Sequence, residues 1–581
     1  MALDSRPLGK MLDEVAAGHI QLPDFQREWK WDDEHIISIL ATVTMAYPMG
    51  VVMTLATGGP GGKFKTRPLQ GVQPADDVRP EQLLLDGQQR MTALYQALKS
   101  GRPVDTFDQR DDPRNLWYYI HIETAIDPKA DRESAIRSLP ENKIIKPLGR
   151  RLGLDLTTIG REYENGYFPL WYAFDRDRAE EWQWGYTDGH PERRAAWVAF
   201  RKAALDNIWD YRVPLITLEK ETPRDAVCTV FEKVNTKGVQ LTVFELLTAT
   251  FAGDEEYTGQ HGEFHLPDHW KDTRDELTAA HPVLGGLQNT DFLQAVCLAS
   301  TYHKPRAPIS CKRRDLLELE LADYLKWAPK ITDALHWAGE FLTDQCIVRA
   351  EDLPYRTQLP PLAAIRTVLG RETDTPEARE KLAQWYWCGV FGEQYGGTAD
   401  SRFPRDVEQV VTWLRGGREP ESIQEATFVD QRLLTMNSRN SAAYKGVFAL
   451  LLQWGCIDWY YTDKPISGDQ VADGTVDIHR IFPAAWCDKN RIDVQRRDSV
   501  VNKTLLSGRA AKTLGKNAPS TGLEMLERET GIRPNWLDDA LVSHVIDPAF
   551  LRASEFDGFF HSRMTDLVHL IKQAMAKRAT T

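Results

Sequence analysis

Apolar residues follow two kinds of pattern early in the chain, and their order predicts a strand that leads into a helix. Short apolar runs typical of strands lie at 51–55, at 83–85 and, later, at 211–218. Directly after the second run, apolar residues recur at helical spacing from Met91 to Leu98. Residues 83–99 are therefore predicted to form a strand, a tight turn and a helix.

Helical patterns dominate after residue 220. Residues 226–234 have the spacing of a helix. Thr242, with Glu245 three residues later, forms a capping box ahead of an apolar helix over 243–251. Helical spacing then continues from about 256 to 460.

One further strand is predicted at 476–483, followed by a polar region and helices. The predicted fold class is accordingly α+β and mostly helical. We expect three parts: an α/β unit over 1–255, a helical connecting region over 256–425, and a small α+β unit over 426–581.

The composition is that of an ordinary globular protein. Of the 581 residues, 42% are hydrophobic and 27% are charged, which argues against bulk disorder. The seven cysteines contain no CxxC pair, which favours a reducing compartment and speaks against a disulfide framework or a thiolate zinc site. Because the sequence shows no apolar leader and no apolar stretch of about 20 residues, we expect a soluble, cytoplasmic protein with no membrane partner.

The sharpest local feature is the run Asp86-Gly87-Gln88-Gln89-Arg90 in the predicted turn. Backbone N–H groups at a helix N-terminus attract anions, Gly87 permits the turn, and Arg90 offers a forked donor suited to phosphate. The sequence has no Walker P-loop, so this turn would be the phosphate cradle. The five residues alone leave a second interpretation equally open, in which Asp86 only caps the helix and Arg90 is a solvated surface residue.

Two other segments, taken with residues 86–90, have the order and spacing of three motifs of a known family. Residues 23–31 read Pro-Asp-Phe-Gln-Arg-Glu-Trp-Lys-Trp, and residues 231–241 read Phe-Glu-Lys-Val-Asn-Thr-Lys-Gly-Val-Gln-Leu. Taken singly, the first is explained by core aromatics and the second by an Asn/Gly helix end. Together with residues 86–90 they resemble the ParB-like NTPase domain with a DGQQR signature. That domain occurs in GmrSD-type modification-dependent restriction enzymes and in SspE-type phosphorothioate-sensing defence proteins, and the resemblance covers about residues 5–255.

This resemblance implies binding and hydrolysis of GTP or another NTP, together with sensing of modified DNA. The implied NTP-binding residues are Arg27, Asp86, Gly87, Gln88, Gln89, Arg90, Lys233, Asn235 and Gly238. The implied modification-sensing residues are Pro23, Phe25, Gln26, Trp29 and Trp31. Sulfur in place of a non-bridging oxygen is larger, softer and less hydrated, so an apolar lining would favour phosphorothioate. No residue separates this modification from glucosylated hydroxymethylcytosine.

The segment Asp477-Ile478-His479-Arg480-Ile481-Phe482-Pro483 resembles the HNH, or ββα-metal, nuclease domain of the same enzymes. In such sites one His activates the attacking water, and nearby ligands hold one divalent ion, here Mg²⁺ or Mn²⁺. The implied catalytic residues are His479, Arg480 and Asn502, with His479 and Asn502 as metal ligands. For a lone His before an apolar run, a structural role is the commoner explanation.

The nuclease match is imperfect. Relatives read D-I-H-H-I-F-P, so Arg480 stands at the position of the general base and His479 at that of the preceding metal ligand. The family's second Asn falls at Ala511. An arginine stays charged at physiological pH and is a poor base. Two hypotheses follow: His479 acts from a shifted position and some nicking is retained, or the nuclease is crippled.

The formal charge of -13 is unevenly distributed. Residues 477–517 contain nine Lys and Arg against four Asp, a net charge of +5, which leaves -18 on the rest of the chain. A second basic cluster lies at 304–314. Beside a nuclease-like motif, such runs favour contact with DNA phosphates. The predicted DNA-binding residues are Lys312, Arg313, Arg314, Arg496, Arg497, Lys503, Arg509 and Lys512.

We therefore expect an anti-phage restriction protein, an NTP-dependent and modification-sensing DNA nicking endonuclease with double-stranded DNA and nucleotide as partners. One alternative is a nuclease-dead sensor that binds NTP and DNA and signals to a separate effector. Another is a regulatory DNA-binding protein whose turn at 86–90 is purely structural. A homodimer is left open.

Overall fold

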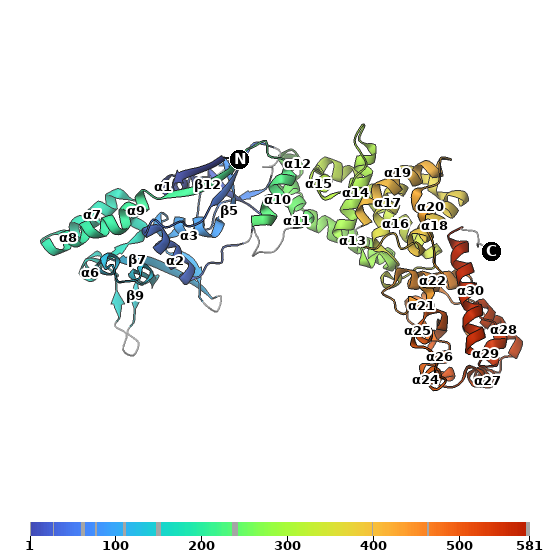
Figure 1. The fold of residues 1–581 in the computed structure, drawn as a ribbon. Helices are drawn as coiled ribbons and strands as arrows, with labels where there is room; N and C mark the ends of the chain where they lie inside the picture. The colour runs from blue at the N-terminus through green and yellow to red at the C-terminus, as the bar shows by residue number, and fades with distance from the viewer. Residues whose placement is uncertain are drawn as a thin grey trace. The chain divides into compact units, whose positions relative to one another are not determined.

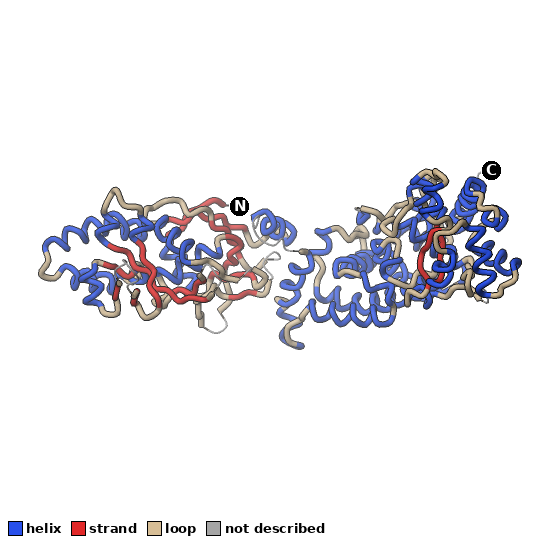
Figure 2. The backbone as a smooth tube through the Cα atoms, turned by 90° about the horizontal axis from the view of Figure 1, so that it is seen from below, coloured by secondary structure: helices blue, strands red, loops and turns tan. Residues whose placement is uncertain are grey.

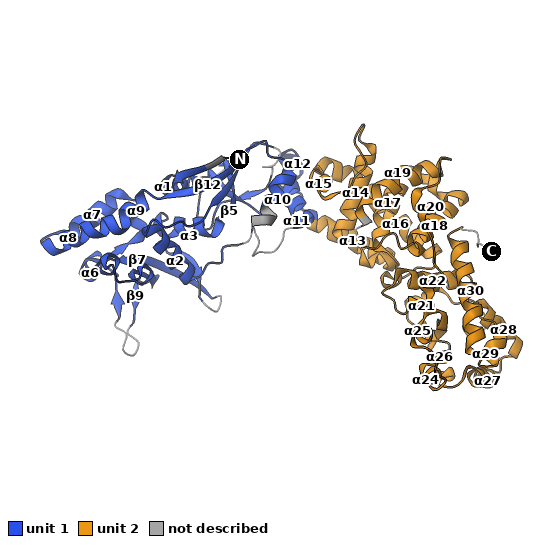
Figure 3. Ribbon diagram, viewed as in Figure 1, with its two compact units in different colours: residues 1–266 blue, residues 267–581 orange. Residues whose placement is uncertain are grey.

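The chain forms two compact units, Met1–Leu266 and Pro267–Thr581 (Figure 3). The computed structural model describes residues 2–26, 28–59, 64–75, 78–108, 112–146, 153–234, 242–397, 399–461 and 464–576. The prediction of an α+β chain that is mostly helix is confirmed. The domain boundaries at 255 and 425 remain predictions.

A six-stranded sheet forms the centre of the first unit (Figures 1 and 2). Its strand order is β1-β12-β3-β5-β2-β4, so that β12 lies between two strands from the start of the chain. β12 pairs antiparallel with β1 and parallel with β3. The strands are β1 Ala2–Pro7, β2 Ile20–Pro23, β3 Val52–Ala56, β4 Thr66–Arg67, β5 Gln82–Asp86 and β12 Arg212–Leu218.

Strand β5 is buried on both faces, which explains its continuous apolar run. Leu84 packs into the larger core of the unit, whereas Leu83 and Leu85 join a smaller cluster with Val227 and Ala249 on the opposite face. The larger core includes residues of α1 (Leu8–Ala16), α2 (Asp33–Thr44) and α3 (Gln88–Leu98), and the smaller one includes residues of α10 (Arg224–Val234) and α11 (Val243–Ala252).

Two local predictions are confirmed in this unit. The strand, turn and helix expected over 83–99 are β5 and α3. Helix α11 begins with the expected capping box, in which the Thr242 side chain accepts from the Glu245 N–H and the Glu245 carboxylate accepts from the Thr242 N–H.

A smaller sheet and several helices complete the first unit. The sheet has the order β11-β7-β6, with β8 also paired to β7. Its strands are β6 Val104–Phe107, β7 Pro113–His121, β8 Ile136–Pro140 and β11 Tyr167–Pro169, beside the short pair β9 Ile144–Ile145 and β10 Leu154–Asp155. The helices are α4 Ile122–Ile126, α5 Arg132–Ala135, α6 Ile159–Asn165, α7 Arg176–Thr187, α8 Pro191–Phe200, α9 Asp206–Trp209 and α12 Glu255–His261.

Helices make up most of the second unit, and its described residues include the antiparallel strand pair β13 (Val476–Arg480) and β14 (Lys503–Ser507) (Figure 2). β13 confirms the strand predicted from 476, although it ends at Arg480. The helices are α13 Leu266–Ala280, α14 Asn289–His303, α15 Arg313–Leu317, α16 Leu321–Asp344, α17 Leu359–Leu369, α18 Pro376–Phe391, α19 Phe403–Leu414, α20 Glu421–Glu425, α21 Arg432–Thr435, α22 Ala442–Gln453, α23 Gly468–Ala472, α24 Ala484–Lys489, α25 Val494–Asp498, α26 Gly508–Leu514, α27 Pro519–Thr530, α28 Pro534–Ser543, α29 Pro548–Arg552 and α30 Phe556–Ala574. In the part of the chain that the structure describes, no helix is both long enough and apolar enough to cross a membrane.

Candidate functional site

The turn at 86–90 joins a buried strand to a buried helix through one glycine. Asp86 is the last residue of β5, and α3 starts at Gln88. Gly87 lies between them with φ 93°, in the left-handed region that favours glycine. Gln88 and Gln89 are almost fully buried, whereas the Asp86 side chain is 34% exposed. The carboxylate of Asp86 is thus reachable from solvent.

Arg90 braces the loop that precedes β3. Its guanidinium donates to the carbonyls of Met49 (2.9 Å) and Val51 (3.0 Å) and to Asp86 Oδ2 (3.1 Å). Gly50 beside it has φ 90°, in the left-handed region that favours glycine, and a Cβ there would lie 2.6 Å from Arg90 Nη1. Arg90 therefore has a structural role in this turn, whichever ligand the turn binds.

Amide side chains join the first predicted motif to the second. Gln26 Nε2 donates to the carbonyls of Leu84 (2.6 Å) and Leu85 (3.2 Å) in β5. Gln89 Nε2 donates to the Glu28 carbonyl (3.1 Å), and its Oε1 accepts from the Lys30 N–H (3.0 Å). The structure therefore brings Gln26, Glu28 and Lys30 next to β5 and the turn at 86–90.

The third predicted motif is described only in part. Lys233 lies on α10, but its side chain is not among the described ones. Arg27, Asn235 and Gly238 lie outside the described residues. Their assignment to NTP binding remains a prediction.

The five predicted sensing positions fall into different environments. Pro23 ends β2, and the half-buried Phe25 packs edge-to-face on Phe64 with ring centroids 5.3 Å apart, beside the smaller apolar cluster. Trp29 is 6% exposed, and its Nε1 donates to the Asp105 carbonyl at 2.5 Å. Trp29 is thus a core residue, in agreement with the simpler explanation of this segment, while Trp31 is half-buried against it. Phe25 is the sensing candidate at the edge of an apolar cluster.

Replacing Gly87 with alanine is expected to lower the free energy of unfolding by about 1–2 kcal/mol through the left-handed backbone alone. The added Cβ would also lie 3.1 Å from Val52 Cγ2, so the total cost is larger. Urea unfolding measures this change. Gly101→Ala is the matched control, because Gly101 has φ 65° but an added Cβ there would meet no atom within 4 Å. Equal costs for the two variants would contradict the close contact.

In the second unit, strand β13 places His479 opposite Thr504 of β14. Paired residues in antiparallel strands project from the same face, so these two side chains share one side of the strand pair. Burial lowers the pKa of His479, an effect that Asp477 and Asp458 partly offset. A neutral imidazole at neutral pH is suited to accept a proton or bind a metal.

Arg480, by contrast, is tied to a carboxylate. Its Nε and Nη2 donate to Asp498 Oδ1 at 3.2 and 2.8 Å. The pKa of Asp498 is lowered to about 2, chiefly by hydrogen bonds from Arg497 and then by those from Arg480. Arg480 is thus a charged partner in an ion-pair cluster, and this geometry gives it no role as a base.

Asn502 is fully buried, and its amide is used by the backbone. Its Oδ1 accepts from the Phe482 N–H at 2.8 Å, and its Nδ2 donates to the carbonyls of Phe482 (3.0 Å) and Arg497 (2.9 Å). The prediction of Asn502 as a metal ligand does not fit this environment, because its oxygen is already bonded and shielded. Asn502 holds the chain that follows β13 to the chain that precedes β14.

A divalent ion therefore does not fit the described residues around His479. Arg480 carries positive charge, Asn502 is saturated, and Ala511 has no donor atom. Among the described residues, no group of three or more His, Cys, Asp or Glu side chains is arranged to hold a metal ion. The neutral imidazole of His479 remains suited to accept or donate a proton.

The predicted DNA-binding residues fall into two groups, one buried or ion-paired and the other exposed. Lys503 is 8% exposed, donates from Nζ to the Asn437 carbonyl at 2.6 Å and packs on Tyr444, so the prediction that it contacts DNA is wrong. Arg496 and Arg497 are engaged by Asp557 (2.7 Å) and by Asp488 and Asp498. The exposed members of the set are Lys312, Arg313, Arg314, Arg509 and Lys512.

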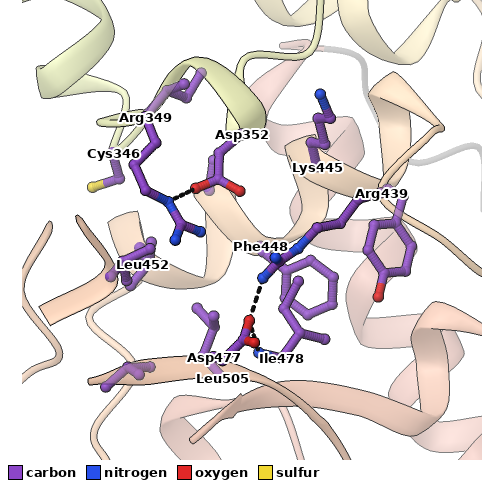
Figure 4. Close-up of a pocket in the computed structure, with 15 residues that line it drawn as sticks. Cys346, Arg349, Asp352, Arg439, Lys445, Phe448, Leu452, Asp477, Ile478 and Leu505 are labelled. Carbon is purple, nitrogen blue, oxygen red and sulfur yellow. Dashed lines mark hydrogen bonds and ion pairs between the residues drawn. The ribbon is translucent and has the colours of Figure 1, made fainter. Parts of the chain in front are cut away.

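A small pocket lies beside β13, and no sequence pattern predicts it (Figure 4). Arg439 reaches Asp477, and Arg349 Nε donates to Asp352 at 2.6 Å. Lys445 donates to the Leu353 carbonyl at 3.0 Å. These residues are far apart in the sequence, and apart from Asp477 they belong to no motif, so no sequence signal brings them together. The Arg439–Asp477 ion pair joins β13 to the segment around 439, and Lys445 joins α22 to the segment around 350.

Comparison with known proteins adds two findings. Residues 8–252 match the family model of the GmrSD restriction endonuclease N-terminal domain. An uncharacterized protein of Methanocaldococcus jannaschii is 23% identical over 543 residues, which cover 90% of this chain and 87% of that protein. The first finding supports the resemblance seen over residues 5–255. The ParB-like and HNH-like details remain predictions.

Proposed function

We propose that this protein is a restriction-type defence nuclease that acts on DNA. The observation that carries the proposal is the family match over residues 8–252, which spans the turn at 86–90 and the segment hydrogen-bonded to it. The turn offers a helix N-terminus without a side-chain cap, which suits a phosphate. It also offers a reachable carboxylate, Asp86, which suits a metal ion or a water.

We further propose that NTP, with GTP favoured, binds at this turn. Asp86 is suited to orient a water or a metal-bound nucleotide, because its side chain is reachable while Arg90 fixes one of its oxygens. Asp86→Asn keeps an oxygen for Arg90 but removes the charge. We expect it to lower NTP hydrolysis about tenfold or more, while leaving unfolding in urea nearly unchanged.

For the DNA modification we propose phosphorothioate, sensed at Phe25. Its ring packs on Phe64 at the edge of an apolar cluster, a surface that favours the less hydrated sulfur. The test compares NTP hydrolysis with plain, phosphorothioated and glucosylated DNA. Phe25→Ala should remove the preference for sulfur. A variant that still prefers phosphorothioate would exclude Phe25, and stimulation by glucosylated DNA alone would exclude phosphorothioate.

Strand cleavage is tested separately on supercoiled plasmid with Mg²⁺ or Mn²⁺. If the second unit nicks DNA, His479→Ala should lower relaxation about 100-fold or more. A second function, a nuclease-dead sensor, is favoured by Arg480 in its ion pair and Asn502 in its saturated environment. It predicts NTP hydrolysis stimulated by DNA and no strand breaks with either metal. Relaxation that persists unchanged in His479→Ala would exclude His479 from catalysis.

A further inference from the structure

Three segments of the second unit meet on one surface: the end of α14, the start of α15 and the first half of α16. Thr301 Oγ1 on α14 donates to the Ser310 carbonyl ahead of α15 at 3.1 Å. The His303 ring lies 4.4 Å from the Trp327 ring of α16, and Lys304 pairs with Asp323 at 2.7 Å. The contacts bring basic residues from separate parts of the sequence close together.

Two lysines on this surface have an unusual arrangement. Lys326 and Lys330 are exposed and one helical turn apart, and their Nζ atoms lie 4.9 and 4.6 Å from the ring centroid of Trp327. Within the described ranges, no carboxylate pairs with either lysine or with the exposed Lys312. Like charges four residues apart on a helix repel each other. An external anion would remove this repulsion.

Several basic residues around the strand pair β13–β14, where the net positive charge of the sequence predicts DNA contact, do have carboxylate partners. There Arg480 pairs with Asp498, Arg497 with Asp488 and Asp498, and Arg496 with Asp557, while Lys503 is buried. The cations without a carboxylate partner among the described residues therefore include Lys312, Lys326 and Lys330 at the α14–α16 surface. The paired cations near β13 would have to give up carboxylates before binding DNA.

We propose that Lys312, Lys326 and Lys330 bind the phosphate backbone of double-stranded DNA. The proposal rests on the proposed function only in taking DNA as the partner. Lysine ammonium groups are point charges on flexible stems, so they suit phosphates of any sequence. Trp327, which is 4% exposed, supports the two stems and offers no face for base stacking, which favours the duplex backbone over unpaired bases. Binding here is independent of base sequence and of modification.

The test measures binding of the full-length protein to a plain duplex of about 30 base pairs by fluorescence anisotropy at several KCl concentrations. Each phosphate contact contributes a slope of about 0.9 to the dependence of log K on log salt. Lys326→Gln with Lys330→Gln should reduce that slope by about 2 and weaken binding at low salt. The matched control is Lys271→Gln with Lys381→Gln. Lys381 also lies over a tryptophan, Trp413, at 5.4 Å, but it pairs with Glu377 at 2.8 Å.

An unchanged slope in the double variant would overturn the proposal, as would an equal reduction in the control. Because all four lysines are partly or fully exposed, urea unfolding should be alike in all proteins. The readout is separate from NTP hydrolysis and nicking. Loss of slope in a protein without either activity would support this surface while contradicting the proposed enzyme function.

Discussion

Asn502→Ala is expected to lower the free energy of unfolding of the second unit by about 3 kcal/mol. The amide of Asn502 satisfies three backbone groups in a fully buried position: the Phe482 N–H, the Phe482 carbonyl and the Arg497 carbonyl. Each buried group left without a partner costs about 1–3 kcal/mol. Urea titration followed by tryptophan fluorescence measures the loss.

Two further variants test the cause. Asn490→Ala removes an exposed amide that donates to the Trp486 carbonyl, and its effect should stay within about 0.5 kcal/mol. Asn502→Asp keeps an oxygen for the Phe482 N–H but turns a carboxylate oxygen toward two carbonyls, so it should cost at least as much as alanine. A near-neutral Asn502→Ala would contradict the bracing role and reopen a functional role for this residue.

The second large effect concerns His544, a fully buried histidine behind β14. Its Nε2 lies 2.8 Å from the Ile457 carbonyl, which can only accept, so Nε2 carries the proton. Nδ1 then accepts from Thr504 Oγ1 at 2.5 Å. Burial lowers the pKa of His544 to about 3, and the positive charge of the buried Arg563 adds to this.

The protein is therefore expected to lose stability on acidification. The folded pKa lies below the unfolded value of 6.5, so the folded state binds fewer protons, and stability falls as the pH drops below 6.5 toward 3. At about pH 5 the loss from this group is about 2 kcal/mol. Urea unfolding at about pH 7.5 and about pH 5 should show this loss in the wild type and not in His544→Gln. The exposed His561→Gln should retain it.

The sequence predicts best those features that depend on neighbouring residues. The turn at Gly87, the capping box at Thr242 and the start of β13 follow from local spacing, and the structure has all three. The prediction of phosphate binding at 86–90 rests on residue type and stays a prediction. Arg90, however, donates to the carbonyls of Met49 and Val51. Neighbouring residues do not predict these bonds, because they depend on the loop that packs against the turn.

Features that depend on distant residues could not be predicted. Lys503 counts as a basic residue in the sequence, yet β14 carries it inward to the Asn437 carbonyl. Asn502 matches a nuclease motif, while its saturation by Phe482 and Arg497 arises only once the chain is folded. The net charge of residues 477–517 likewise overstates the positive charge available to DNA. The fold brings carboxylates from outside the segment to its cations, as Asp557 does for Arg496.

The position of β12 between β1 and β3 has a consequence for synthesis of the protein. β12 spans Arg212–Leu218. The edges of β1 and β3 that pair with β12 therefore stay unpaired until most of the first unit has been translated. During that time their unpaired edges are open to association with other chains. A nascent chain paused before β12 leaves the ribosome would thus be a target for chaperones, and a shortened expression product that ends before Arg212 should aggregate.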